Sequence, residues 1–381
     1  MSERHLRRSL TRELGVTRLQ LAQTHRMLLA KRLLADTGLP VIRVAEASEF
    51  RSLRRFNAIF RERYRMPPTT VRRNLRQRKG VPSVNGQQSA ADDMIRLTLA
   101  YRAPMNWDGT LALLARRALT GVESIAESVY FRTVEIDGLA GVIRVQGPDV
   151  EVVSEPELRV EASASLLPAL TPLIAGLRRP LDLEADPVAI DSCLMEAGLG
   201  SLVRQRPGLR VPGAFDPFAA ALQGLLTPGS GSAARVVRTL GAPATTVVPE
   251  LDRLVPRPKA VVAAGRDTLR EAGVPESRAA ALVGFARVFV SGSIRLEPDD
   301  DPVESQERLL GVEGIDGALA DLLTLQALDW PDAFPGSDPE LERAAGVPDR
   351  RALEARAEHC RPWRAYAAHH LWLAESPAET E

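Results

Sequence analysis

The spacing of hydrophobic residues changes twice along the chain, from a helical period to a strand-like period and back again. Within residues 19–38 apolar side chains recur every three or four positions, which predicts an amphipathic helix that ends near Gly38. Residues 158–165 instead alternate strictly between apolar and polar side chains, as half-buried strands do. From about residue 168 onward the helical period returns in short segments that Gly and Pro interrupt. The pattern therefore predicts a helical region, an α+β region and a second helical region.

The first helical region has the pattern of a helix-turn-helix. Residues 2–14 predict a leading helix, and residues 41–64 predict a short helix, a break and a second helix opened by Ser52. The apolar residues of that second helix recur at i, i+3 and i+7, at Leu53, Phe56 and Phe60. In helix-turn-helix proteins such a second helix lies in the major groove of DNA.

The middle region predicts an antiparallel sheet with helices on one face. Residues 80–93 are rich in Gly, Ser, Gln and Asp, and they predict a linker that precedes it. A helix over 110–119 is expected between the first two strands. Further alternating runs are separated by Asp-Gly and Gly-Pro-Asp turns, at 130–136, 141–145 and 150–153. This order of elements is typical of an α+β domain.

Charge is distributed very unevenly along the 381 residues, although the net charge is zero. Residues 1–80 contain 20 Arg and Lys but only 6 Asp and Glu, a net charge of +14 that the rest of the chain balances. Such a basic segment indicates a nucleic-acid partner, and the alternatives are a solvated basic surface or an acidic protein partner. A chain of this length is expected to form two or three domains.

Composition excludes several classes of protein. Two cysteines, Cys193 and Cys360, are too few for a disulfide framework, a four-cysteine zinc site or an iron–sulfur cluster. The chain has no apolar run of about 18 residues and no apolar signal core, so we expect a cytoplasmic protein without a membrane partner. It also lacks a P-loop, a GxGxxG after a strand, an HExxH and a GxSxG.

Two features of the last region could support chemistry. Residues 309–328 predict a helix, a glycine-rich turn and a helix, a hairpin whose backbone N–H groups suit a DNA phosphate. Further on, Asp338 precedes Pro-Glu-Leu, a strong helix opening, so this aspartate could be a plain N-cap or a reactive carboxylate. It stands 24 residues after Gly314 and 34 before Trp372.

With these spacings, residues from about 96 to 375 resemble the AlkA-type 3-methyladenine DNA glycosylases of the helix-hairpin-helix superfamily. The matching stretches are 105–134, 206–226, the hairpin, and 361–372. Residues 2–79 resemble the AraC-type helix-turn-helix region of Ada-type alkylation-response regulators, with the first motif incomplete; 20–41 and 52–64 carry this likeness.

The resemblance implies a multi-domain fold: an all-α helix-turn-helix region, an α+β antiparallel-sheet domain, and an all-α helix-hairpin-helix glycosylase domain. The expected boundaries are 1–79, a linker at 80–93, 94–205 and 206–376. It also implies hydrolysis of the N-glycosidic bond of alkylated bases in double-stranded DNA, without a cofactor or a metal ion. Such an enzyme would work in the cytoplasm, at the nucleoid.

The same resemblance implies roles for individual residues. Asp338 occupies the family's catalytic position, where a carboxylate stabilises positive charge on the sugar. Trp372 would stack on the electron-poor base, with Leu113 as pocket wall and Arg117 at the rim. The candidates for DNA binding are Gly311, Gly314, Arg4, Arg7, Arg8, Arg54, Arg55 and Asn57.

Lysine usage favours a monofunctional enzyme. The chain contains Lys31, Lys79 and Lys259, and none of them lies in the hairpin. Bifunctional relatives place a Schiff-base lysine in the hairpin, at the position of Ala318 here. Strand cleavage by imine chemistry is therefore not expected, and water should accept the sugar.

The chain also departs from the family pattern. Asp316 puts a negative charge in the hairpin where a phosphate would approach. Six other positions also differ from the family pattern. Ala318 and Leu322 replace aromatic residues, Gly229 replaces the leucine that wedges into the duplex, Glu340 replaces an apolar residue, and Glu49 and Arg51 replace glycines. Two main accounts stay open: a glycosylase with altered base selection, or a degraded glycosylase fold that acts as a DNA-binding transcriptional regulator of the alkylation response. An inactive fragment is a third. We favour the first, because Asp338 and Trp372 keep the family pattern.

Overall fold

The computed structural model describes residues 18–36, 40–48, 50, 52–78, 94–148, 156–226, 231–296 and 300–375. Contacts divide the chain into two compact units, residues 1–98 with 160–173 and residues 99–159 with 174–381. Several predictions lie outside the described residues: the helix over 2–14, the linker over 80–93, the strand over 150–153, and Arg4, Arg7, Arg8, Glu49, Arg51, Lys79 and Gly229.

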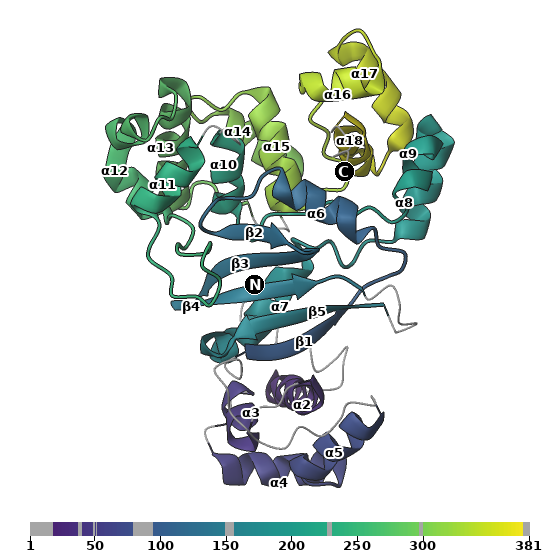
Figure 1. Ribbon diagram of the computed structural model, residues 1–381, viewed down its shortest axis with the longest axis vertical. Helices are drawn as coiled ribbons and strands as arrows, with labels where there is room; N and C mark the ends of the chain where they lie inside the picture. The colour runs from purple at the N-terminus through teal and green to yellow at the C-terminus, as the bar shows by residue number, and fades with distance from the viewer. Residues whose placement is uncertain are drawn as a thin grey trace. The chain divides into compact units, whose positions relative to one another are not determined.

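Four helices of the first unit form the predicted helix-turn-helix region. They are α2 (Arg18–Asp36), α3 (Val41–Ala47), α4 (Leu53–Tyr64) and α5 (Pro68–Arg78), drawn in purple and dark blue in Figure 1. Ser52 is the N-cap of α4, and its Oγ accepts a hydrogen bond from the Arg55 backbone N–H at 3.4 Å. Phe56 and Phe60 are fully buried, whereas Leu53, predicted on the same face, is 38% exposed in the first turn. The helix–break–helix pattern over 41–64 is confirmed.

Five strands form one sheet in the order β1-β5-β4-β3-β2. Their bounds are β1 Met94–Ala100, β2 Glu123–Ala126, β3 Val129–Ile136, β4 Leu139–Gln146 and β5 Glu157–Ser163. Strands β2, β3 and β4 are antiparallel neighbours, with Glu123 opposite Arg132 and Arg132 opposite Ile143. Asp137 and Gly138 join β3 to β4 with φ of 52° and 78°, as two-residue hairpin turns require.

Two details of the sheet differ from the sequence-based expectation. The alternation of residues 158–165 predicts a strand to Ser165, but β5 ends at Ser163 and a 3₁₀ helix, η2 (Ala164–Ala169), follows. The short edge strand β2 was not predicted, because four residues are too few to establish a period of two.

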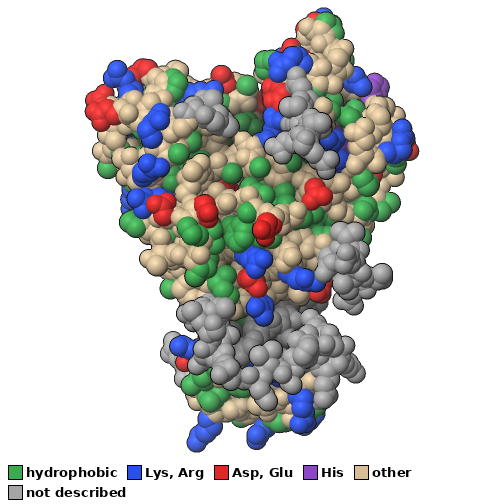
Figure 2. Space-filling view, in the orientation of Figure 1, with side chains coloured by type: hydrophobic (Ala, Val, Ile, Leu, Met, Phe, Trp, Pro, Cys, Tyr) green, Lys and Arg blue, Asp and Glu red, His purple; other side chains and the backbone are tan. Residues whose placement is uncertain are grey.

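The helices of the second unit form two groups. The first group packs around one apolar core and comprises α10 (Pro217–Leu225), α11 (Ser232–Leu240), α12 (Pro258–Glu271), α13 (Glu276–Ser291), α14 (Pro302–Leu310) and α15 (Gly317–Leu328). The second comprises α8 (Pro187–Leu194), η3 (Met195–Leu199), α9 (Gly200–Gln205), α16 (Pro339–Ala345), α17 (Arg350–Ala357), η4 (Glu358–Cys360) and α18 (Arg364–Glu375). Helix α6 (Trp107–Ala115) lies between the groups in Figure 1, and α7 spans Leu170–Arg178. Figure 2 shows the surface hollowed between the two groups.

None of the helices within the described ranges combines the length and the apolar character that a membrane crossing would need.

A buried carboxylate ties the sheet to the first helical group. Glu123, at the start of β2, is 6% exposed and accepts four hydrogen bonds. The donors are the Leu119 N–H at 3.0 Å, Tyr130 Oη at 2.6 Å, Arg132 Nη1 at 2.6 Å and Gln223 Nε2 at 3.0 Å. Burial acts to raise the pKa of Glu123, but Arg132 and the hydrogen bonds outweigh it and hold the pKa below its ordinary value. The pair is therefore charged inside the molecule, and hydrogen bonds occupy both oxygens of Glu123.

Removing the cation of this pair should destabilise the second unit strongly. In an Arg132→Met variant, Glu123 would remain buried without its counter-charge, and we expect a loss of about 3–5 kcal/mol. Urea unfolding followed by tryptophan fluorescence measures this, since all four tryptophans belong to the second unit.

Arg257→Met is the matched control, because Arg257 pairs with Glu135 at the surface with 66% of its side chain exposed. That variant should lose much less stability than Arg132→Met, because an exposed ion pair contributes little to the free energy of unfolding. Equal losses in the two variants would show that the buried pair has no special role.

Candidate active site

Asp338 and Trp372, predicted from their spacing to share a site, are in direct contact. Asp338 is the N-cap of α16, with Pro339 in the first helical position, and its Oδ1 accepts a hydrogen bond from the Glu340 N–H at 2.9 Å. Its Oδ2 accepts a hydrogen bond from the indole Nε1–H of Trp372 at 2.8 Å. Both donors are neutral N–H groups, so they fix the carboxylate in place without cancelling its charge. The N-cap prediction is confirmed, and the cap leaves the second oxygen to the tryptophan.

Trp372 belongs to a compact apolar cluster on α16, α17 and α18. Trp372 is only 8% exposed, and Leu341, Leu353 and Leu371 pack in the same cluster. Leu322 of α15, one of the departures from the family pattern, packs against this cluster. The indole is therefore covered, and a base could stack on it only after some of these neighbours moved.

Helix α18 contains two buried histidines, His369 and His370, and both are neutral. The His369 ring meets the Trp372 ring edge-on, with centroids 4.9 Å apart. Burial lowers the pKa of His369 to about 3 and that of His370 to about 4. At pH 7 these imidazoles therefore bring no positive charge next to the Asp338 carboxylate.

Helix α6 and the two residues that follow its last position contribute Leu113, Arg116 and Arg117 to this part of the molecule. Leu113 is 5% exposed and packs with Leu209 and Leu373. Arg117 Nη2 donates to the carbonyl oxygens of Pro212 and Gly213, both at 2.6 Å, so this side chain holds a loop. Its neighbour Arg116, which the sequence analysis did not single out, donates to the Trp372 carbonyl and pairs with Glu340.

The helix-hairpin-helix is formed by α14 and α15, and its glycines have different functions. Gly314 has φ +83°, and a Cβ there would lie 2.8 Å from the Ala281 Cβ on α13, so the turn requires glycine. Gly311 has φ −73° and carries no such requirement. Asp316 is the N-cap of α15, and its Oδ1 accepts a hydrogen bond from the Leu319 N–H at 2.9 Å. The carboxylate thus uses one of the N–H groups that a phosphate could otherwise bind.

The DNA-binding candidates of the first unit that lie within the described residues, Arg54, Arg55 and Asn57, belong to α4. Arg54 and Arg55 are exposed and Asn57 is half-buried, while Phe56 and Phe60 of the same helix form its buried face. The helix therefore presents arginines to solvent, as the sequence pattern predicted.

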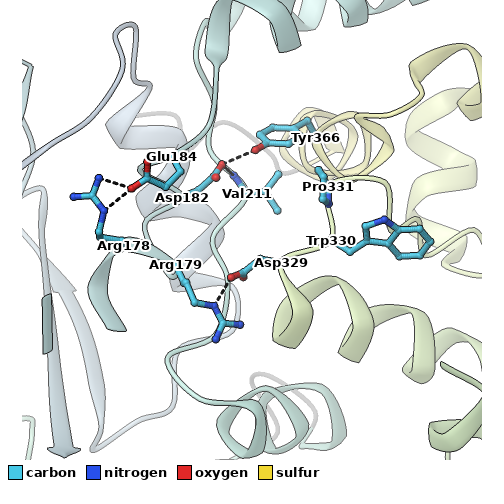
Figure 3. A pocket seen from close by; sticks show the side chains of 9 residues that line it. All are labelled: Arg178, Arg179, Asp182, Glu184, Val211, Asp329, Trp330, Pro331 and Tyr366. Carbon is cyan, nitrogen blue, oxygen red and sulfur yellow. Dashed lines mark hydrogen bonds and ion pairs between the residues drawn. The ribbon is translucent and has the colours of Figure 1, made fainter. Parts of the chain in front are cut away.

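A cavity of about 210 Å³ lies elsewhere in the second unit (Figure 3). Its lining residues are Arg178, Arg179, Asp182, Glu184, Val211, Asp329, Trp330, Pro331 and Tyr366. Asp182 Oδ2 accepts hydrogen bonds from Tyr366 Oη at 2.8 Å and from the Val211 N–H at 3.1 Å. Figure 3 also shows Arg179 paired with Asp329. The polar groups of this cavity satisfy one another, and neither Asp338 nor Trp372 lines it.

No group of three or more His, Cys, Asp or Glu side chains within the described ranges is arranged to hold a metal ion.

Comparison with known proteins gives matches over almost the whole chain. A family model described as the AlkA N-terminal domain matches residues 96–216, and a model described as a helix-turn-helix domain matches residues 1–74. The probable bifunctional transcriptional activator/DNA repair enzyme AlkA of Mycobacterium tuberculosis is 30% identical over 388 residues, covering 97% of this chain and 74% of that protein. DNA-3-methyladenine glycosylase 2 of Escherichia coli is 28% identical over 288 residues, covering 73% of this chain and 97% of that protein.

Among solved structures, the 3-methyladenine DNA-glycosylase from Archaeoglobus fulgidus aligns with a TM-score of 0.61 at 19% identity. The alignment covers 72% of this chain and 97% of that chain, and at such low identity it shows the fold alone. The predicted fold class, a helix-turn-helix region followed by an antiparallel-sheet domain and a helical glycosylase-like domain, is confirmed.

An Asp182→Asn variant should change how stability depends on pH. Burial raises the pKa of Asp182 from 3.8 to about 7, so the folded wild type holds a proton that the unfolded chain releases above about pH 4. The contribution of Asp182 to the free energy of unfolding of the wild type is therefore lost as the pH rises through 7. An asparagine does not titrate, so the variant does not lose stability in this way. From pH 5 to pH 8 the variant should gain on the order of 1–3 kcal/mol relative to the wild type in urea unfolding. A difference that does not change with pH would contradict the assignment.

Proposed function

Because the chain belongs to the AlkA family of bifunctional transcriptional activator and DNA repair enzymes, we propose that it releases alkylated bases from double-stranded DNA by hydrolysing the N-glycosidic bond. The observation that carries this proposal is the Asp338 carboxylate, which is held at 2.8 Å by the Trp372 indole and at 2.9 Å by the Glu340 N–H. As a protein that acts on chromosomal DNA, it would work in the cytoplasm, at the nucleoid.

The chemistry requires a fixed negative charge rather than a strong acid. Alkylation at N3 or N7 makes a purine cationic, so the base is already a good leaving group. As the glycosidic bond breaks, positive charge develops on the deoxyribose, and a carboxylate beside it lowers the energy of that state. Asp338 suits this task because its two hydrogen bonds come from neutral donors, which orient both oxygens before the sugar arrives.

Trp372 supports the proposal because its indole lies next to Asp338 and because the electron-rich ring face can bind a cationic base. An indole face attracts a cationic base, and neutral His369 beside the ring adds no repelling charge. Because Trp372 is 8% exposed, base entry requires neighbours such as Leu322 to give way. The apolar Leu322 and Ala318, in place of aromatic side chains, lead us to propose altered base selection rather than a lost activity.

We propose a monofunctional reaction in which water accepts the sugar. The hairpin position of the Schiff-base lysine in bifunctional relatives is Ala318, and Lys259 lies at the start of α12. The products would be a free base and an abasic site in an intact strand.

A second function, sequence-dependent binding of DNA, is favoured by the first unit. Its α4 is the second helix of a helix-turn-helix and presents Arg54 and Arg55 to solvent. We propose that α4 enters the major groove, as in a transcriptional regulator.

The repair proposal predicts that Asp338→Asn abolishes base release. The asparagine keeps a side-chain oxygen for capping but loses the charge, so we expect the single-turnover rate on methylated duplex DNA to fall by at least about a hundredfold. Mass spectrometry of the freed bases, with gel analysis of the strand, measures the rate and shows whether the backbone stays intact.

Asp349→Asn is the matched control, because Asp349 caps the nearby helix α17 through the Ala352 N–H at 2.9 Å. This variant should retain the wild-type rate. Equal rates for wild type and Asp338→Asn would favour the regulator account, and strand cleavage without alkali would contradict the monofunctional reaction.

The binding proposal predicts that Arg54→Ala and Arg55→Ala weaken binding of the full chain to its duplex. Each lost phosphate contact should lower the slope of log K against log salt by about 1. Fluorescence anisotropy at several salt concentrations measures the slopes. Arg43→Ala, which removes an exposed arginine of α3 paired with Glu46, is the control and should leave the slope unchanged. Slopes unchanged in all three variants would exclude α4 from the interface.

A further inference from the structure

Arg116 connects the two helix ends that carry Asp338 and Trp372. Its Nη1 donates to the Trp372 carbonyl oxygen at 3.3 Å, and its Nη2 forms an ion pair with Glu340 Oε1. Glu340 in turn supplies the N–H that binds Asp338 Oδ1 at 2.9 Å. With the bond from the Trp372 indole to Asp338, these contacts form a closed ring of four residues.

Both residues that Arg116 contacts lie at the end of a helix. Trp372 lies in the last turn of α18, and Glu340 lies in the first turn of α16. A guanidinium is favourable at a helix C-terminus, and a carboxylate is favourable at an N-terminus. Arg116 and Glu340 therefore occupy the ends that suit their charges, and the ion pair joins one end to the other.

The geometry of arginine fits this bridging position. A guanidinium presents several N–H donors in one rigid plane, so one side chain can bind a carbonyl and a carboxylate together. Arg116 starts from the C-terminal end of α6, where the adjacent Arg117 is fixed to the carbonyls of Pro212 and Gly213. The bridge is thus built on an anchored segment.

We propose that Arg116 is a positioning residue of the active site. It acts through Glu340 and the Trp372 carbonyl to hold the Asp338 carboxylate and the Trp372 indole in the relative orientation that the reaction requires. The inference rests on the proposed glycosylase function. It also explains why Glu340, a charged residue where the family pattern has an apolar one, is compatible with a working site: the charge is paired.

Breaking the ion pair between Arg116 and Glu340 should have little effect on the stability of the fold. The side chains of Arg116 and Glu340 are 35% and 28% exposed, and pairs of this exposure contribute little to the free energy of unfolding. The expected effect of breaking the pair is therefore on the alignment of the site, with the fold retained.

The test combines a spectroscopic measurement with kinetics on the full chain. The variants are Arg116→Ala, Glu340→Ala, the double variant, Arg116→Lys, and Arg257→Ala as a control for a partly exposed Arg–Glu pair. With 5-fluorotryptophan incorporated, the ¹⁹F resonance of Trp372, assigned with Trp372→Phe, reports the environment of the indole. Single-turnover base release and the dissociation constant for the methylated duplex are measured in parallel.

We expect the Trp372 resonance to shift or broaden in both alanine variants and in the double variant, and to be unchanged in Arg257→Ala. Base release should slow by about tenfold in each single variant and no further in the double variant, because the two residues act as one unit. The dissociation constant should change by less than about twofold, and Arg116→Lys, with one donor group for two acceptors, should be intermediate.

An unchanged Trp372 resonance in Arg116→Ala, or losses that multiply in the double variant, would overturn the inference. If the wild type released no base, the proposed function would fail, but the ¹⁹F spectra would still decide whether Arg116 positions the indole.

Discussion

The hydrogen bond from the Trp372 indole to the Asp338 carboxylate is the interaction on which the proposed active site depends. It joins the beginning of α16 to the last turn of α18, across 34 residues of chain. A hydrogen bond to a charged group contributes about 1.5–3 kcal/mol, more than a neutral one. The apolar cluster of Leu341, Leu353 and Leu371 packs around it and keeps the two helices together. The bond fixes the carboxylate and the ring relative to each other, while the helix cap and the apolar cluster hold each of them separately.

The two oxygens of Asp338 have different partners, so one residue can cap a helix and also take the chemical role that we propose for it. Asp338 Oδ1 caps α16 through the Glu340 N–H, an interaction of the kind that contributes about 1 kcal/mol to a helix. Oδ2 accepts a hydrogen bond from the indole N–H, a neutral donor that leaves the negative charge in place. The cap fixes the side-chain rotamer, and a fixed rotamer is what electrostatic stabilisation of a short-lived cation requires. Asp349 and Asp316 are also helix N-caps, and each accepts a hydrogen bond from the N–H three residues further on.

Local sequence patterns predicted most of the elements but few of the long-range pairings. Ser52 opening α4, Asp338 opening α16 and the hairpin around Gly314 are encoded within a few residues, so they could be read directly. The family spacing brought Asp338 and Trp372 together correctly. The pair of Arg116 with Glu340 joins residues 224 positions apart, and no local rule indicates it. The buried bonds of Glu123 and the cover over Trp372 likewise depend on packing between elements that are distant in sequence.

Charge stabilisation by Asp338 is the central claim, and binding of a cationic sugar mimic tests it most directly. In the duplex probe a protonated pyrrolidine replaces the damaged deoxyribose, and a neutral tetrahydrofuran site serves as the reference. The account predicts that the wild type binds the pyrrolidine duplex at least about tenfold more tightly than the reference, since transition-state mimics bind preferentially. In Asp338→Asn this preference should vanish. An equal preference in wild type and variant would show that the carboxylate does not act on the sugar.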